Sequence, residues 1–331
     1  MMRRAGLLAL AFAGAVQAAP CDRGCLQALA DRVLDSMAAG DASTLPLAQP
    51  YAATENSVPS APVMMAAWRS VSAAPRRFYA IDAVSQQVFI VASVDEGARP
   101  TLLWGRLRAA GGRLAEIELY ENRSRGQGGY QFGGEGPANF PAAWTAAVAA
   151  DRLPSRHVLL GHGRAIFDSR RRALPAAPGC VLMENGKVVE EHPEVAAEVA
   201  GGAAPPAGET KRVNIPCGLP PQRPTDAKAR TEIVDELQGI VVSQGVVHGV
   251  AEPMIVTTPA ESAFVPEQIL APYAAMLKKQ QASGRYGAPA LKPMPASAAA
   301  AEVHRVYDGQ VQGQLLLVNL GAPGSRSPWA P

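Results

Sequence analysis

Two acidic residues stand in the same local context in the two halves of the chain. Glu55 belongs to the segment TENS (54–57) and Glu184 to the segment MENG (183–186). A carboxylic acid enclosed in an apolar cavity is harder to ionise than in water, so it can exchange protons near neutral pH. In such a turn the same side chain commonly accepts hydrogen bonds from nearby backbone amides and fixes the loop. Glu55 and Glu184 are therefore the candidate catalytic residues, with a structural role as the alternative.

Histidine is the other residue type with acid–base chemistry. The chain has five histidines, and none stands at metal-ligand spacing. His248 and His304 lie in strand-like segments and are the two candidates for a base. No Gly-x-Ser-x-Gly segment or dinucleotide-binding fingerprint is present, so hydrolase and redox functions have no positive support. We expect no cofactor and no metal site.

The four cysteines are Cys21, Cys25, Cys180 and Cys217. Four cysteines allow three pairings, and the pairing Cys21–Cys25 with Cys180–Cys217 keeps each disulfide within one half of the chain. A metal site is the alternative, but neither pair has Cys-x-x-Cys spacing and no histidine stands beside one at ligand spacing. The sequence favours two disulfides.

The N-terminus has the three parts of a secretory signal. Arg3 and Arg4 precede an apolar run, and small residues at 18 and 19 provide rival cleavage sites. The run is too short to span a bilayer, and no later stretch is long and apolar enough to do so. Pro20 is a poor fit to lipid attachment at Cys21. We expect an exported protein, periplasmic or secreted, in a compartment where disulfides form.

Length and composition restrict the class of protein. The 331 residues suffice for two domains of ordinary size, and 48% hydrophobic residues suffice for proper cores. The formal net charge is only +2, and the arginine runs at 76–77 and 170–172 are short. A nucleic-acid-binding protein concentrates basic residues on one face, so nucleic acid is not an expected partner.

The first half reads as one helix followed by strands. Apolar residues recur at helical spacing over 25–38, and a polar, proline-containing stretch around Tyr51 follows. Alternating segments then predict antiparallel strands, with Gly111 and Gly112 in a hairpin turn. These strand segments are 76–82, 86–94, 100–109 and 113–123. The glycine-rich stretch 123–141 is expected to be a linker.

The second half repeats this plan. A helical stretch over 156–172 leads to Cys180 and the MENG segment, and an Ala/Gly/Pro-rich insertion runs to Cys217. Strand-like segments cover 232–250 and 302–320, with a helix-like piece at 266–281 between them. Asp235 and Glu236 are expected to form a solvated turn. The paired TENS and MENG segments and the paired hairpins, in the same order, indicate an internal duplication.

These features resemble the nuclear transport factor 2-like superfamily, which includes ketosteroid isomerases, SnoaL-like polyketide cyclases and many binding proteins. The closest likeness is to a group of secreted bacterial and fungal proteins of unknown function, and it covers nearly the whole mature chain. It rests on Cys21-x-x-x-Cys25, the TENS segment, Cys180 through MENG, Val234-Asp235-Glu236 with Gly239-Ile240-Val241, and Pro323-Gly324 through Trp329. The chain departs from the pattern at Ser57, at Leu237-Gln238 and in the final hairpin, where glutamines replace an expected acidic residue.

The resemblance implies an α+β fold of two tandem cone-shaped units, each a curved antiparallel sheet wrapped around helices. It divides the chain into a signal peptide (1–19), a first domain (20–122), the linker (123–141) and a second domain (142–331). The expected pocket residues are Tyr51, Trp68, Tyr79, Tyr307 and Trp329, and Asp308 joins Tyr307 as a possible stabiliser of an enolate.

Three functions fit this fold. The first is the binding of a small apolar or amphipathic molecule. The second is a cofactor-independent isomerase or cyclase that uses Glu55 or Glu184 for proton transfer. The third is a protein–protein interaction module with its two units packed sheet to sheet. Fold does not decide among them, and the ligand, the presence of catalysis and the oligomeric state stay open.

Overall fold

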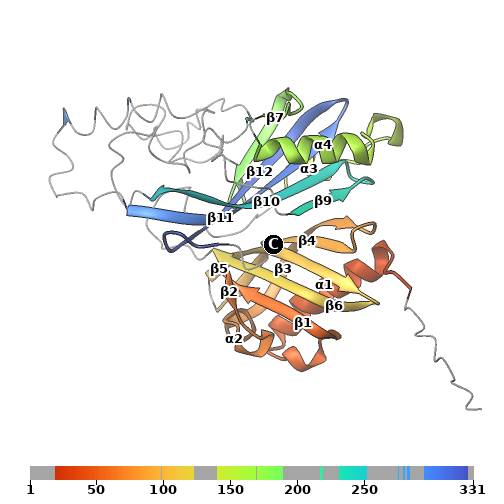
Figure 1. Cartoon of the computed structure of the whole chain (residues 1–331), viewed down its shortest axis with the longest axis vertical. Helices are drawn as coiled ribbons and strands as arrows, with labels where there is room; N and C mark the ends of the chain where they lie inside the picture. The colour runs from red at the N-terminus through yellow and green to blue at the C-terminus, as the bar shows by residue number, and fades with distance from the viewer. Residues whose placement is uncertain are drawn as a thin grey trace, which may run out of the picture.

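The fold is known from a computed structural model, which describes residues 19–97, 99–122, 140–168, 170–188, 217–218, 231–251, 275, 279, 282–283 and 294–326. Nearly all of the expected signal sequence and of the expected linker, most of the insertion and Trp329 lie outside the described residues. The chain forms two halves that lie one above the other in Figure 1. We call residues 19–122 the first half and residues 140–326 the second half.

The first half contains one long helix and a six-stranded sheet. The helix α1 is Arg23–Ala38, and short helical turns lie at η1 (Ala42–Thr44), η2 (Pro62–Met64) and α2 (Ala67–Ser70). The strands are β1 (Leu47–Glu55), β2 (Val58–Pro59), β3 (Val71–Asp82), β4 (Gln87–Glu96), β5 (Arg99–Ala110) and β6 (Arg113–Asn122). Their order in the sheet is β2-β1-β6-β5-β4-β3.

The second half has the same order of elements. Its helical segments are α3 (Ala142–Thr145), η4 (Ala150–Arg152) and α4 (Arg156–Ile166). Its strands are β7 (Ala176–Glu184), β8 (Lys187–Val188), β9 (Thr231–Asp235), β10 (Ile240–Ala251), β11 (Met294–Tyr307) and β12 (Gln310–Gly321). The order β8-β7-β12-β11-β10-β9 matches that of the first sheet strand for strand. The chain therefore has mixed α+β content arranged around two sheets of equal topology. Both sheets are mixed and not antiparallel as expected, because β1 pairs in parallel with β6 and β7 pairs in parallel with β12.

Local sequence explains the main elements. Asp22 caps α1, because its side chain accepts a hydrogen bond from the backbone N–H of Cys25 at 2.8 Å. Gly111 and Gly112 have φ of 55° and 73°, values that favour glycine, and they form the predicted turn between β5 and β6. The predicted helix at 156–172 is shorter in the structure, where α4 ends at Ile166.

The polar stretch around Tyr51, for which the sequence predicted neither a helix nor a strand, is a strand. It forms β1, which pairs in parallel with β6 from Ala52 opposite Glu116 to Glu55 opposite Leu119. Its burial does not follow the alternation typical of a half-buried strand. Pairing with a distant strand, which hydrophobic periodicity does not report, stabilises this segment.

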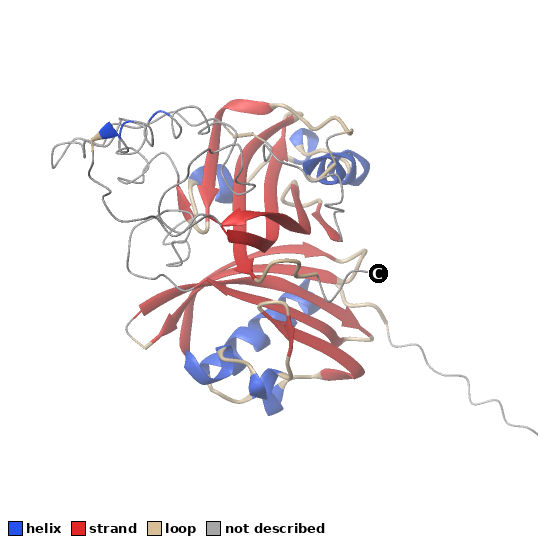
Figure 2. Ribbon diagram, turned by 60° about the vertical axis from the view of Figure 1, so that its left-hand side comes forward, coloured by secondary structure: helices blue, strands red, loops and turns tan. Residues whose placement is uncertain are grey.

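The two sheets face each other, and the long helices α1 and α4 cover their outer faces (Figure 2). Apolar side chains alternate along the strands, so that one set packs under the helix and the other between the sheets. The cluster between the sheets draws on both halves. Its large members are Phe78, Phe89, Leu102, Trp104, Tyr120, Trp144, Met183, Ile233, Ile240, Leu315 and Leu317. The largest apolar surfaces of both sheets are thus buried against one another.

Two reciprocal ion pairs join the halves at one end of this packing. Asp235 accepts hydrogen bonds from Arg23, the first residue of α1, at 2.8 Å and from the backbone N–H of Ile81 at 2.9 Å. Asp82 accepts from Arg156, the first residue of α4, at 2.7 Å and from the backbone N–H of Val234 at 3.1 Å. Each half therefore supplies the aspartate that holds the other half's helix and strand.

This arrangement corrects one expectation from the sequence. Asp235 is fully buried, with 0% of its surface exposed, whereas a solvated turn was expected. Only its neighbour Glu236 is exposed. An aspartate at the end of a strand resembles a turn residue in sequence, and its partners are far away in the chain.

Asparagines make a second reciprocal set at the other end of the intersheet packing. Asn56 and Asn185 follow the equivalent strands β1 and β7, with φ of 50° and 46°. The amide of Asn122 donates to the Oδ1 of Asn185 at 3.1 Å, and that of Asn319 donates to the Oδ1 of Asn56 at 3.3 Å. The two halves are thus related by an approximate two-fold arrangement of residues, and not only of strands.

Disulfides connect Cys21 to Cys25 and Cys180 to Cys217, which confirms the predicted pairing. Disulfides of this kind fit an oxidising compartment, as expected for an exported chain. A search of the described residues for a helix of the length and hydropathy needed to cross a membrane found none.

Candidate functional site

Glu55 lies at the end of β1, where backbone amides surround its carboxylate. One carboxylate oxygen accepts from the N–H of Ala66 and the other from the N–H of Ala67, both at 2.9 Å. Ala67 begins the short helix α2. These contacts match the structural role proposed for the acidic turn, so the geometry does not favour Glu55 as a general base.

Glu184 occupies the equivalent place at the end of β7. Glu55 stands opposite Leu119 in the first sheet, and Glu184 stands opposite Leu316 in the second. Glu184 is 3% exposed and therefore buried. The proposed catalytic role of this carboxyl group stays a prediction.

Four of the five aromatic residues proposed for a pocket lie in the described part of the chain, and these four do not come together. Trp68 is 3% exposed, and its indole N–H donates to the hydroxyl of Ser36 at 3.0 Å within the core under α1. Tyr79 packs beside that core and donates to Asp31 at 2.7 Å. Tyr51 is half-buried on β1. Tyr307 is in the other half, where Arg152 lies 5.3 Å from its ring centroid, and Trp329 is outside the described residues.

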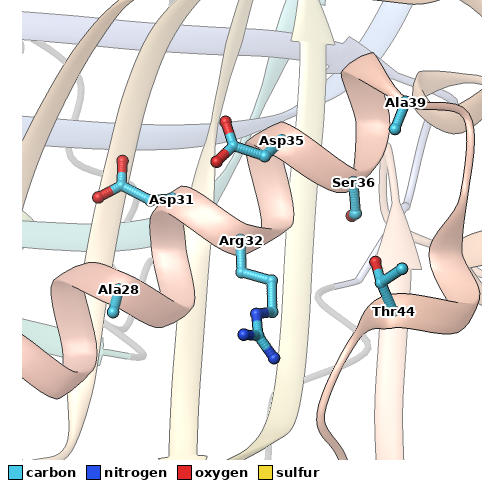
Figure 3. A pocket seen from close by; sticks show the side chains of 7 residues that line it. All are labelled: Ala28, Asp31, Arg32, Asp35, Ser36, Ala39 and Thr44. Carbon is cyan, nitrogen blue, oxygen red and sulfur yellow. The ribbon is translucent and has the colours of Figure 1, made fainter.

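An open groove of about 610 Å³ runs along the outer surface of α1 (Figure 3). Asp31 and Asp35 point to one side of the helix and hold Arg77, at 2.9 and 2.6 Å, whereas Arg32 points to the other side. The groove is open to solvent, and its lining comes mostly from one helix and includes the charged side chains of Asp31, Arg32 and Asp35. It is not the apolar pocket that the resemblance implies.

The strongest candidate site is a chain of buried polar side chains in the second half. It consists of His162 on α4, Glu302 and His304 on β11, and Gln314 on β12. Their exposed fractions are 2%, 0%, 2% and 3% in that order. All four face the interior between α4 and the second sheet, where they are surrounded by Leu159, Leu182, Val241 and Val306.

Hydrogen bonds fix the tautomers of the two imidazoles. The backbone N–H of Leu174 donates to the Nδ1 of His162 at 3.0 Å, so the proton of this ring lies on Nε2. That Nε2 is 2.8 Å from the Nδ1 of His304, which must accept. His304 then carries its proton on Nε2, 3.1 Å from the Oε2 of Glu302. The chain runs in one direction, from α4 to the carboxylate.

Gln314 extends the chain to the segment beside the second disulfide. Its amide donates to Glu302 at 3.1 Å and to the carbonyl of Gly218 at 2.6 Å, and its Oε1 accepts from the N–H of Gly218 at 2.8 Å. Because Cys217 is bonded to Cys180 on β7, this segment is anchored on two sides. The polar chain is therefore part of a rigid frame.

Both imidazoles are neutral at ordinary pH. Burial, which disfavours the imidazolium ion by desolvation, and the adjacent His304 ring together lower the pKa of His162 to about 3. Burial also lowers the pKa of His304 to about 3. Two neutral imidazoles in line can donate and accept hydrogen bonds, and they can pass a proton by changing tautomer together.

The first half provides an internal reference for these positions. The N–H groups of Asn56 and Asn185 donate to the carbonyls of Leu119 and Leu316, both at 2.8 Å, which makes those leucines equivalent. The strand pairing then gives the other equivalent positions, because Gly105 lies opposite Leu119 and Glu302 lies opposite Leu316. Gly105, Leu107 and Ile117 in the first sheet correspond to Glu302, His304 and Gln314 in the second.

The helices correspond in the same way, because Arg23 and Arg156 both begin a helix and both pair with an aspartate of the other half. Six residues further along, Leu29 corresponds to His162. The first half is thus apolar or glycine at all four positions, and the second half is polar at all four. The same fold forms without the polar chain.

Of these four buried polar side chains, the sequence indicated only one. His304 was a candidate base because of its strand-like segment, whereas His162, Glu302 and Gln314 were missed. The duplication was visible in the sequence. Aligning the two halves and searching for polar residues opposite apolar ones would have found the strand members.

Comparison of the chain with protein-family models, with curated proteins and with solved structures gave no match. Among the described residues, no group of three or more His, Cys, Asp or Glu side chains is arranged so that it could hold a metal ion.

Proposed function

We propose that this chain is an exported binding protein of the nuclear transport factor 2-like superfamily, built from two tandem cone-shaped units. In this proposal the second unit binds a small apolar or amphipathic molecule between α4 and its sheet. The first unit serves as a packed scaffold. The buried chain from His162 to Gln314 is the observation that carries the proposal.

Energetics support a functional origin for the polar chain. A buried polar network contributes little net stability compared with apolar side chains of similar volume, and it is costly when incompletely satisfied. The first half shows that Leu29, Leu107 and Ile117 can fill the same positions. Ligand pockets are typically apolar with a few polar groups that orient the ligand. Four polar groups within an apolar core have that composition.

The same groups suggest how a ligand would be held. Its apolar part would contact the aliphatic side chains around Leu159 and Val306, and its polar end would exchange hydrogen bonds with the imidazole chain. Because both imidazoles are neutral, an uncharged alcohol, ketone or amide is a better match than a charged headgroup. We therefore expect an uncharged amphipathic molecule.

A binding experiment with an uncharged fluorescent probe tests the proposal. N-phenyl-1-naphthylamine is titrated into the mature, oxidised chain, and dodecanol and dodecane are then compared as competitors. We expect saturable binding and stronger displacement by the alcohol. Replacing His304→Leu, the residue of the first half, should weaken the binding of the alcohol about fivefold, since one hydrogen bond contributes about 1 kcal/mol.

The matched control is Leu107→Met at the equivalent position of the first half, a change of nearly constant volume. It should leave the affinity for both competitors unchanged. A folded wild-type chain that fails to bind the probe would contradict the proposal. Equal effects of the two substitutions would also contradict it, because the second half would then have no special role.

Proton transfer is a second candidate function, which the 3.1 Å contact between His304 and Glu302 favours. A histidine–carboxylate pair can act as a base toward a carbon acid. Isomerisation of a β,γ-unsaturated ketone, followed by ultraviolet absorbance, tests this function. Glu302→Gln should abolish the rate but preserve binding of the probe, and an unchanged rate would exclude this mechanism. The two sheets pack face to face, as the interaction-module hypothesis expected, but this packing buries the apolar sheet faces that a partner protein would use.

A further inference from the structure

Arg305 on β11 is a buried cation on the opposite face of the second sheet from His304. Only 3% of its surface is exposed. One guanidinium nitrogen, Nη2, donates to the backbone carbonyl of Ala146, just after α3. Its Nε and Nη1 have no hydrogen-bond acceptor among the residues that the structure describes. The Arg305 guanidinium is also 5.9 Å from the ring centroid of Tyr307.

A guanidinium ion buried in this way normally has a carboxylate partner. Removing a charge from water is unfavourable unless an opposite charge and hydrogen bonds compensate for it. Neither is present around Arg305 in the described part of the chain, apart from the carbonyl of Ala146. The site is therefore short of one anion.

The first half shows what this arginine position normally binds. Arg108 and Arg305 occupy equivalent positions. Arg106 on β5 and Val303 on β11 are matched residues that face the other sheet, and each arginine stands two residues nearer the hairpin turn. Arg108 stands opposite Glu116 on the next strand and donates to it through Nε at 2.7 Å. Arg305 stands opposite Gly313. Glycine has thus replaced the carboxylate partner in the second half.

The place that a side chain at 313 would take is filled by Trp144 of α3. A Cβ atom added to Gly313 would lie 2.7 Å from the Cε2 and 2.9 Å from the Nε1 of this indole, which is too close for any other residue type. Trp144 is 1% exposed and packs against Phe78 and Phe140 at centroid distances of 6.0 Å. Its Nε1 also has no acceptor among the described residues.

Two kinds of unsatisfied donor therefore meet at one place. Arg305 supplies Nε–H and Nη1–H with a positive charge, and Trp144 supplies an indole N–H beside the facing glycine. A carboxylate accepts from both donor types and neutralises the charge. An uncharged acceptor would leave the charge uncompensated.

We propose that Arg305 and Trp144 form a binding site for the carboxylate group of a small ligand, which supplies the negative charge that Glu116 supplies beside Arg108. This site is separate from the imidazole chain, since the two lie on opposite faces of β11. It does not depend on the proposed function of the second unit. Both contacts come from around the short helix α3. The indole N–H of Trp144 would donate to the ligand's carboxylate group, and the carbonyl of Ala146 accepts from the guanidinium of Arg305.

Thermal unfolding of the mature, oxidised chain tests this site. The melting temperature is measured against the concentration of sodium acetate, of sodium phosphate and of sodium chloride at equal ionic strength. A ligand that binds the folded chain raises the melting temperature in a saturable way. We expect such a rise with acetate beyond that with chloride. A rise with phosphate alone would overturn the assignment to a carboxylate.

Three variants make the test specific. Arg305→Met should weaken acetate binding at least tenfold, and Trp144→Phe, which keeps the ring contacts, should weaken it a few-fold. Arg108→Met is the matched control and should leave acetate binding unchanged. Without acetate, Arg305→Met should melt at the wild-type temperature or higher. If it instead melts lower than Arg108→Met, or if acetate stabilises it as it does the wild type, the proposal is wrong.

Discussion

The two reciprocal ion pairs between the halves predict a large and localised loss of stability when an aspartate is removed. In Asp235→Ala the buried N–H of Ile81 loses its acceptor, which costs about 1–3 kcal/mol. Arg23 loses its partner as well, but its side chain is 33% exposed, so water can replace the carboxylate at a cost of about 0–1 kcal/mol. The side chain of Gln238 loses a further hydrogen bond of 2.9 Å.

These contributions add up to a loss of about 3 kcal/mol, which corresponds to more than about a hundredfold change in the unfolding equilibrium constant. Urea unfolding, followed by tryptophan fluorescence and by circular dichroism, measures it. Asp82→Ala should cost a similar amount, because Asp82 makes the equivalent contacts with Arg156 and Val234.

Asp35→Ala is the matched control, since Asp35 also pairs with an arginine at 2.6 Å but is 65% exposed. An exposed ion pair contributes about 0–1 kcal/mol, and alanine is a better helix former, so this variant should be nearly neutral. If Asp235→Ala is no more destabilising than Asp35→Ala, the intersheet ion pairs do not stabilise the association of the halves. That outcome would refute the reasoning.

Two further predictions concern the second half. The free energy of unfolding should fall as the pH decreases from about 6.5 toward 3, because His162 and His304, with pKa values lowered to about 3 by burial, bind protons only when the chain unfolds. The free energy of unfolding should change by about 1.4 kcal/mol per pH unit for each imidazole. Urea unfolding should show a smaller change with pH in the double variant His162→Leu/His304→Leu than in the wild type. Gly161→Ala should raise the free energy of unfolding by about 0.5–1 kcal/mol, because a Cβ at this position of α4 meets no neighbouring atom and alanine favours the helix, and a lower melting temperature would contradict this expectation.

The local elements were predictable because their signals are local. The hairpin of β5 and β6 follows from alternating residues around Gly111 and Gly112, and α1 follows from the apolar residues at helical spacing over 25–38. The disulfide pairing followed from keeping each pair within one half. Each of these predictions depends on residues that are close together in the chain.

The long-range features could not be predicted in this way. The strand β1 is polar and half-exposed, so only its pairing with β6 reveals it. Asp235 has the sequence context of a turn, yet its partners Arg23 and Ile81 are 212 and 154 residues away. The same holds for His162, whose partner His304 is 142 residues away and on another element.

The internal duplication supplies information that neither half contains alone. Equivalent positions share a backbone environment, so a difference in residue type between the halves reflects something other than the needs of the fold. At Leu107 and His304 the difference is an apolar residue against a polar one under the helix. At Glu116 and Gly313 the first half has a carboxylate and the second half has none, although both halves have an arginine at the facing position. At these two places the second half departs from the fold that both copies share, and they are the places at which we propose that it binds ligands.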